Sequence, residues 1–203
     1  MFKKWMREYI EINKREILVV IGLILIGIII GVGVYIFASN ATKELAISSV
    51  KSVFDISKSE SYVKTNVITN GIKADLLLIL ILAILSVTLF GKWIIYLIVT
   101  LKGVALSLYT ILLFNVFGPL WGILAFILLV LLVNILYLPA LIYLVVTFLE
   151  VNFNIFKTRI NNINVVGIYK VLLAIFITFV IMFSSIVVEQ ITSSVVLNIY
   201  NKL

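Results

Sequence analysis

The sequence predicts an all-α integral membrane protein that crosses the bilayer about five times. Of its 203 residues, 64% are hydrophobic and only 12% are charged, and the mean hydropathy is +1.27. Soluble domains carry about 25% charged residues, so this chain has too much apolar surface for a water-soluble fold. Apolar runs separated by short polar segments place the expected spans at residues 17–38, 75–90, 93–114, 120–150 and 165–188.

Composition also limits the chemistry that the chain can perform. It contains no histidine and no cysteine, which excludes imidazole and thiolate metal sites, Ser-His-Asp and Cys-His nucleophiles, and disulfides. We therefore expect neither an enzyme nor a bound cofactor. The net charge of +7 comes from Lys and Arg residues spread between the apolar runs. This distribution favours contact with membrane lipid headgroups over nucleic acid.

Residues 1–16 form a basic segment before the first span. Apolar side chains recur there at helical spacing, namely Phe2, Trp5, Met6, Tyr9 and Ile10. This pattern predicts a short amphipathic helix that lies in the cytoplasmic headgroup region. The alternative is a solvated basic lead-in that only fixes the topology.

The first span, residues 17–38, contains Gly27 and Gly31 in a G-x-x-x-G pattern. Small residues at this spacing allow another helix to approach closely, so we expect a helix-packing face here. Glycine is also common in membrane helices without such a role.

Residues 39–74 form the longest polar segment and are expected to be an extracytoplasmic loop. A short helix in this loop would place Val50, Val53 and Phe54 on one apolar face, and the β-branched residues 62–72 suggest an extended segment after it. The loop is too small for a core of its own. Its expected role is to contact a partner.

The second and third spans, residues 75–90 and 93–114, are separated by Gly91 and Lys92. In an alternative segmentation, one long helix runs through Lys92 and breaks near Gly103. Lys102 would lie near mid-membrane, where a lysine costs about 2.5–3.5 kcal/mol, so it must face the bundle interior or snorkel. The few acidic residues are expected at helix ends, and we favour a structural or interaction role for Lys102 over an ion pathway.

The fourth span, residues 120–150, is longer than the hydrocarbon core and needs a tilt or a kink. Pro139 would supply the kink, and the Asn134 side chain would satisfy a freed backbone group. This pair is interpreted either as a packed kink or as a docking notch. A polar connector then leads to the fifth span and to an extracytoplasmic tail at residues 189–203, where a helix would be amphipathic.

The positive charges set the expected topology. With the N-terminus inside, nine Lys and Arg residues lie on the cytoplasmic side and six outside, with Lys102 in the membrane. The cluster before the first span usually dominates orientation. We therefore expect residues 39–74 and the C-terminus outside the cell.

Three segments resemble the stage II sporulation protein M family of spore-forming bacteria. Residues 101–107 (LKGVALS) resemble its polar-Gly-Phe-x-x-Gly segment, residues 117–124 (FGPLWGIL) its glycine-rich turn, and residues 134–140 (NILYLPA) its Asn-to-Pro-Ala signature. The order of the parts is also similar over nearly the whole chain. Ser107 stands where the family usually has glycine, and Leu132 where it has proline.

This resemblance implies a non-enzymatic scaffold of the sporulation engulfment machinery in the bacterial cell membrane. Such a protein would hold peptidoglycan-degrading partners, the stage II sporulation proteins D and P, at the septum. On this interpretation the candidate interaction residues are Val50, Val53, Phe54, Lys102, Gly103, Asn134 and Pro139. The alternative is a small membrane transporter or channel subunit, for which Lys102 would be a pathway residue.

Overall fold

A computed structural model describes residues 2–56, 60–157 and 165–200, with side chains for residues 7–52, 69–152, 169 and 171–196. Over these ranges the chain forms α-helices and one π-helical segment, with no strand, so the predicted all-α fold is confirmed. The elements are α1 (Phe2–Phe37), α2 (Asn40–Ile56), α3 (Glu60–Ser86), α4 (Gly91–Ala125), the π-helix η1 (Phe126–Leu131), α5 (Leu132–Lys157) and α6 (Val165–Tyr200).

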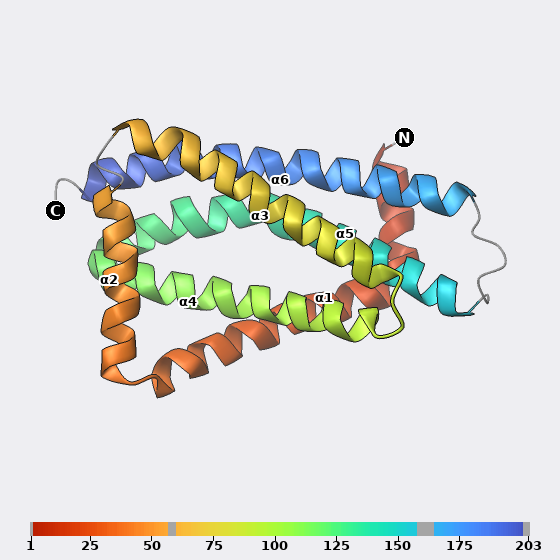
Figure 1. Ribbon diagram of the computed structural model, residues 1–203, viewed down its shortest axis with the longest axis horizontal. Coiled ribbons are helices and arrows are strands. Elements are labelled where there is room, and N and C mark those ends of the chain that lie inside the picture. The colour runs from red at the N-terminus through yellow and green to blue at the C-terminus, as the bar shows by residue number, and fades with distance from the viewer. Residues whose placement is uncertain (1, 57–59, 158–164, 201–203) are drawn as a thin grey trace.

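The long helices run roughly side by side, and α2 lies across one end of the bundle (Figure 1). Four described stretches are long and apolar enough to cross a membrane: Arg7–Phe37, Thr69–Ser86, Gly91–Asn152 and Val171–Val196. The third stretch contains both α4 and α5, which run in opposite directions (Figure 1). The chain is therefore a multi-pass membrane protein, as its composition predicts.

The chain reverses its direction at Gly118, which lies within the element labelled α4. This residue has φ +73° and ψ 177°, within the region that favours glycine, and Pro119 follows it. A Cβ placed on Gly122 would lie 3.1 Å from the Cα of Phe114. In a continuous helix these two residues would be about 12 Å apart along the axis. The turn expected around residues 115–119 is thus made largely by one residue.

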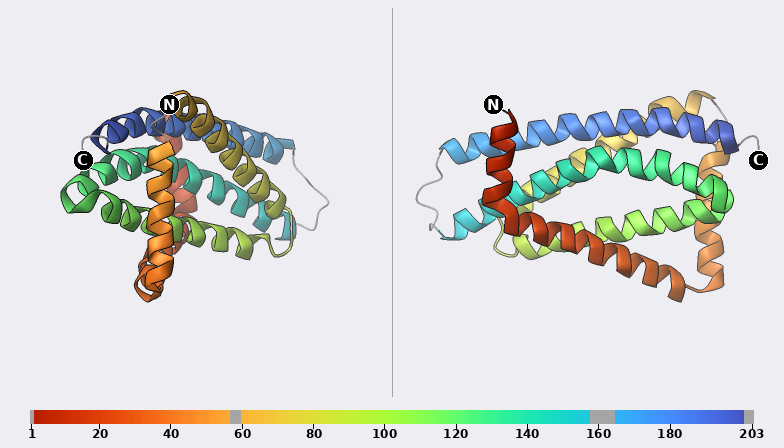
Figure 2. Two further views of the ribbon diagram at one scale, coloured as in Figure 1. Left: turned by 60° about the vertical axis from the view of Figure 1, so that its left-hand side comes forward. Right: turned by 180° about the vertical axis from the view of Figure 1, so that it is seen from behind.

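The N-terminal segment and the first span form one bent helix. Asn13 leaves the helical region, with φ −102° and ψ 15°, and its side-chain amide donates to the Tyr9 carbonyl over 3.3 Å. The part of α1 before this bend turns away from the rest of the helix (Figure 2). The bend at Asn13 therefore lies three residues before Glu16, the last residue of the N-terminal segment predicted from the sequence.

The extended segment predicted for residues 62–72 is wrong, because this part of the chain is helical within α3. Its β-branched residues have only a weak preference against helix. Residues 69–86 are long and apolar enough on average to cross a membrane, and in a membrane a backbone can satisfy its hydrogen bonds only within a helix or a closed barrel. The predicted loop 39–74 is therefore replaced by α2 and the first half of α3.

The irregularity in the fourth span lies before Pro139. The α-helix gives way to a π-helix at η1, and the N–H of Leu132 donates to the Ile127 carbonyl. α5 then continues through Pro139 with helical backbone angles. α5 extends to Lys157, past the predicted end at 150, and α6 is helical from 165 to 200, so the helix does continue into the predicted tail.

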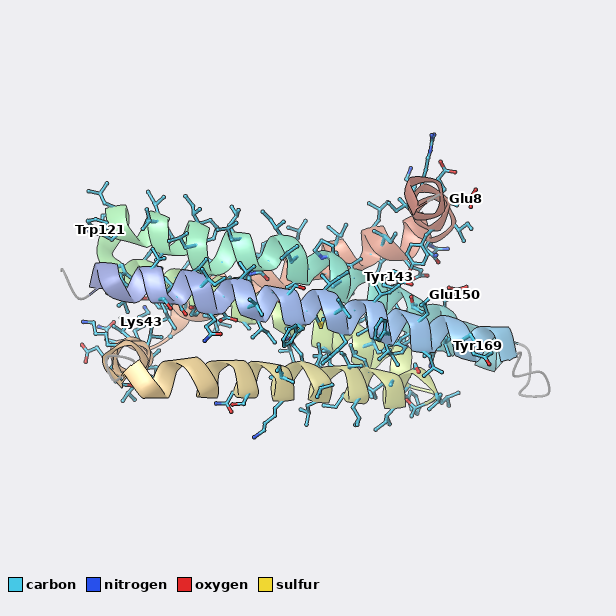
Figure 3. The ribbon with its side chains drawn as sticks, turned by 90° about the horizontal axis from the view of Figure 1, so that it is seen from above. Glu8, Lys43, Trp121, Tyr143, Glu150 and Tyr169 are labelled. Carbon is cyan, nitrogen blue, oxygen red and sulfur yellow. The ribbon has the colours of Figure 1, made fainter. Side chains whose placement is uncertain are left out.

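The two ends of the bundle carry different residues, and we name them the Asn13 end and the α2 end. Glu8, Glu150 and Tyr169 lie toward the Asn13 end, and Lys43 and Trp121 toward the α2 end (Figure 3). The larger apolar core occupies the middle of the bundle and extends toward the Asn13 end, around Leu82, Leu144 and Phe148. A smaller core at the α2 end includes Leu113, Phe117 and Val196.

Candidate functional site

The closest helix contact joins α1 to α4 through small residues. A Cβ on Gly27 would overlap the Thr100 carbonyl and lie 3.0 Å from the Cα of Gly103. A Cβ on Gly31 would overlap the Ser107 hydroxyl. The G-x-x-x-G pair of the first span thus lies against a second small-residue pair, Gly103 and Ser107, at the same spacing.

This contact fixes the depth of Lys102. Gly27 lies ten residues from one end of the predicted span 17–38 and eleven from the other. Gly103 touches Gly27, and Lys102 precedes it in α4. On that predicted span, the lysine lies near mid-membrane. α4 is helical through Gly103, so the alternative break at that position is not present.

Lys102 joins a chain of polar side chains from three helices. Its Nζ donates to the Tyr137 hydroxyl of α5 over 3.1 Å and lies 5.3 Å from the centre of that ring. The Tyr137 hydroxyl in turn donates to Oδ1 of Asp75 in α3 over 3.3 Å. Asp75 is only 7% exposed. The partly buried ammonium is thus linked to a buried carboxylate through one phenol.

The expectation that Asp75 and Glu189 lie at helix ends is wrong. α3 begins fifteen residues before Asp75, and α6 continues eleven residues past Glu189. Both helices exceed the predicted spans, because polar residues continue them on the α2 side. Both carboxyl groups therefore lie within the bundle.

The two acids and Lys102 line one cavity of about 230 Å³ between α3, α4, η1, α5 and α6. The polar side chains around it are Asp75, Lys102, Tyr109, Asn134, Tyr137, Ser185 and Glu189. A volume of this size exceeds the roughly 30 Å³ that one water occupies in the liquid. Sequence reasoning missed the cavity, because its acidic groups come from helices far apart in the chain.

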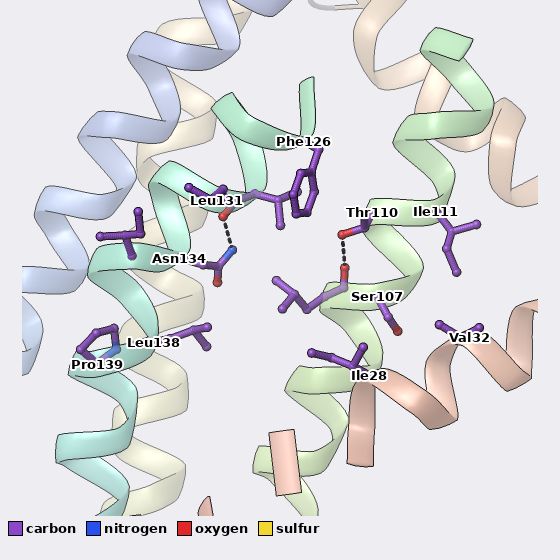
Figure 4. A pocket seen from close by; sticks show the side chains of 13 residues that line it. Ile28, Val32, Ser107, Thr110, Ile111, Phe126, Leu131, Asn134, Leu138 and Pro139 are labelled. Atoms are coloured by element: carbon purple, nitrogen blue, oxygen red, sulfur yellow. Dashed lines mark hydrogen bonds between the residues drawn. The ribbon is translucent and has the colours of Figure 1, made fainter. Parts of the chain in front are cut away.

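A second, larger cavity of about 700 Å³ is an apolar groove between α1, α4, η1 and α5 (Figure 4). Ser107, Asn134 and Pro139 line it together with apolar residues such as Ile28 and Ile135. Ile135 is 58% exposed, so the groove opens on the surface that faces the membrane. Asn134 also lines the polar cavity and thus lies between the apolar groove and the polar cavity.

The Asn134 side chain donates a hydrogen bond to a backbone carbonyl at the end of the π-helix. Its Nδ2 donates to the Val130 carbonyl over 2.7 Å. A π-helix shifts the register of backbone bonds by one residue, so a carbonyl near its end requires another donor. The sequence predicted that the Asn134 side chain would satisfy a free backbone group. It named Pro139 as the cause of that free group, whereas the bonded carbonyl belongs to the π-helix.

The predicted partner-binding residues of the outer segment are distributed differently from expectation. Val50 of α2 is half-buried against the smaller core, near Phe117 and Val196. It therefore attaches α2 to the bundle. The side chains of Val53 and Phe54 lie outside the described residues.

At the Asn13 end, polar contacts tie the helices together. The Tyr96 hydroxyl donates to Oε2 of Glu16 over 2.9 Å, and Lys92 lies over the Tyr96 ring. Asn152, only 5% exposed, donates to the carbonyls of Ser86 over 3.0 Å and Thr88 over 2.8 Å. This amide caps the end of α3, a contact that no sequence pattern predicted.

Within the part of the chain that the structure describes, no three His, Cys, Asp or Glu side chains come together to hold a metal ion. Comparisons with known proteins give no further identification: no protein-family model, no curated protein and no solved structure matches the chain. The candidate sites are thus the polar cavity and the apolar groove.

Proposed function

We propose that this protein is a non-enzymatic scaffold of the sporulation engulfment machinery that holds the stage II sporulation proteins D and P at the septal membrane. The observation that carries the proposal is the position of the residues that bear the family resemblance. Leu106 from the segment 101–107, and Asn134 and Pro139 from the segment 134–140, line one groove. Gly118, from the third segment, makes the reversal that brings those segments together.

The groove suits a membrane-spanning helix of a partner. Its polar side chains are engaged within their own helices: Ser107 donates to the Val104 carbonyl, Thr110 to Leu106 and Asn134 to Val130. Each of these three side chains therefore keeps a donated hydrogen bond when an apolar helix occupies the groove. Helices associate in membranes by close packing of this kind, without a hydrophobic driving force.

The outer segment offers a second contact for the same partners. Because Val50 packs inward, the exposed face of α2 must supply it, and Leu45 on that face is 68% exposed. Lys51 lies on the exposed surface as well and would add charge at the rim. We therefore assign the outer contact to Leu45 and Lys51 in place of Val50.

The experiment is co-purification of the partners from sporulating cells. Ile135→Trp fills the groove, and Leu172→Trp is the matched control, because Leu172 lies on α6 outside the groove with nearly the same exposure, 57% against 58%. We expect Ile135→Trp to lower partner recovery about tenfold, equivalent to about 1.4 kcal/mol, and to block engulfment. Unchanged recovery with Ile135→Trp and with Leu45→Asp would contradict the scaffold proposal.

The proposal also requires the α2 end to face the peptidoglycan. The chain has no cysteine, so single substitutions report cleanly on sidedness. Ser48→Cys in α2 and Ser193→Cys in α6 should react with an impermeant thiol reagent in whole cells, and Glu11→Cys in the N-terminal segment should not. The reverse pattern would place α2 in the cytoplasm and rule out this function.

A transporter or channel subunit is the second candidate, and the polar cavity favours it. The sequence argued against a transporter because no acidic group was expected inside the membrane. Asp75 and Glu189 are such groups, close to Lys102. Intramembrane charges commonly mark transport pathways. Ion or proton flux into reconstituted vesicles, changed about fivefold or more by Lys102→Met, would favour this candidate over the scaffold.

A further inference from the structure

The polar cavity has an imbalance of charge. Its lining contains two carboxyl groups, Asp75 and Glu189, and one ammonium group, Lys102. Lys102 is linked to Asp75 through the Tyr137 hydroxyl. One cation can compensate only one of the two carboxylates, so Glu189 requires a second positive charge.

The position in the membrane makes that requirement strong. An uncompensated carboxylate inside a protein costs several kcal/mol, and at the bilayer centre the cost is similar or larger. A bound proton removes the charge altogether. A metal ion is less suited, because the Lys102 ammonium lines the same cavity and would repel it.

The exposed surface of α3 between the α2 end and Asp75 carries polar side chains. Thr69, Asn70 and Lys73 lie on α3 within two turns of Asp75, on the α2 side, and all three are exposed. These side chains can hold water at the surface of α3 on the α2 side of the cavity.

We propose that this cavity is a proton-binding site, in which Glu189 is the acceptor. The charged and titratable groups that face it are Asp75 from α3, Lys102 and Tyr109 from α4, and Tyr137 from α5, and the η1 residue in the lining is apolar. The carboxyl group binds the proton when Lys102 is committed to the Tyr137–Asp75 chain. This site does not depend on the scaffold function.

The test uses dicyclohexylcarbodiimide, which reacts with protonated carboxyl groups in apolar surroundings. The purified full chain is treated at a series of pH values, and adducts are located by peptide mass spectrometry. We expect an adduct at Glu189 whose rate of formation falls about tenfold per pH unit on the alkaline side of its titration. Glu189→Gln should abolish it, and Glu44→Gln, on the exposed surface of α2, should not.

Infrared difference spectroscopy provides a second measurement that does not depend on access of the reagent. The wild type should show the carbonyl band of a protonated carboxylic acid that bleaches on alkalinisation and is absent in Glu189→Gln. An adduct at Asp75 instead of Glu189, protection of Glu189 by sodium or potassium ions, or retention of the band in Glu189→Gln would each overturn the proposal.

Discussion

Two neighbouring residues of α4 face two regions that are packed differently. Gly103 lies against α1, where backbones meet almost without side chains between them. Lys102 points toward α3 and α5, where side chains form a hydrogen-bonded chain beside a cavity. We call these regions the α1–α4 contact and the polar cavity. The first fixes the helices by shape, and the second leaves room for water and charge in the middle of the membrane.

The difference shows what each region can do. The α1–α4 contact has little freedom, because a Cβ added at Gly27 or Gly103 overlaps a backbone carbonyl and one added at Gly31 overlaps the Ser107 hydroxyl. The polar cavity depends on a few specific bonds, and a change of protonation or of one side chain alters it. We therefore expect substitutions in the α1–α4 contact to affect folding, and those in the polar cavity to affect stability in a charge-dependent way.

The largest effect is expected for Gly27→Leu. The side chain would collide with the Thr100 carbonyl and with Gly103, so the helices must separate, at a cost of about 3 kcal/mol or more. The readout is the free energy of unfolding in mixed detergent micelles. Gly33→Ala is the control, because a Cβ there meets no atom within 4 Å, and it should be neutral or slightly stabilising. Equal losses in both variants would show that the α1–α4 contact is not close-packed.

The next largest effect is expected for Lys102→Met, which leaves Asp75 without its cation. Lys102 is only partly buried and reaches Asp75 through the Tyr137 hydroxyl, so the loss should be about 1.5–3 kcal/mol. Asp75→Asn combined with Lys102→Met should recover part of this loss, since the double variant buries no unpaired charge. A double-mutant cycle measures the coupling, and strictly additive effects would show that the Tyr137-mediated link carries no energy.

A smaller effect is expected for Asn152→Leu at the Asn13 end. This change removes two hydrogen bonds to the carbonyls of Ser86 and Thr88 and should cost about 1–3 kcal/mol. Asn115→Leu is the control, because the Asn115 side chain is exposed and donates only to Ile111 of its own helix. If both variants lose the same stability, the cap on α3 is not specific.

The sequence predicted the parts of this fold that depend on hydrophobicity and small residues. The apolar runs gave the spans, and Gly27 and Gly31 marked the face of α1 that touches α4. The polar cavity was not predictable in the same way. Asp75 and Glu189 are more than a hundred residues apart. Hydrophobicity predicts only the apolar part of α3 and of α6, so it placed Asp75 at the start of one span and Glu189 just after the end of another. The π-helix also left no pattern, since its register shift arises from backbone geometry and not from composition.

The polar segment of α3 was misassigned for a related reason. Thr69, Asn70 and Lys73 suggested a loop by composition, yet they are helical within α3. These polar residues precede the apolar part of the same helix, and the helix continues without a break into the cavity lining at Gly71, Ala74 and Asp75. A composition-based boundary therefore missed the first half of this helix.

The central claim is that water reaches the surface of α3 on the α2 side of Asp75 and does not reach the surface of α1 on the α2 side of Gly27. Asn70→Cys on α3 and Ile30→Cys on α1 are both exposed positions on the α2 side of the Lys102 level. In reconstituted vesicles, an impermeant aqueous thiol reagent should modify Asn70→Cys at least about tenfold faster than Ile30→Cys, because thiolate forms only where water solvates it. Equal rates at the two positions would contradict the hydrated polar side and the comparison built on it.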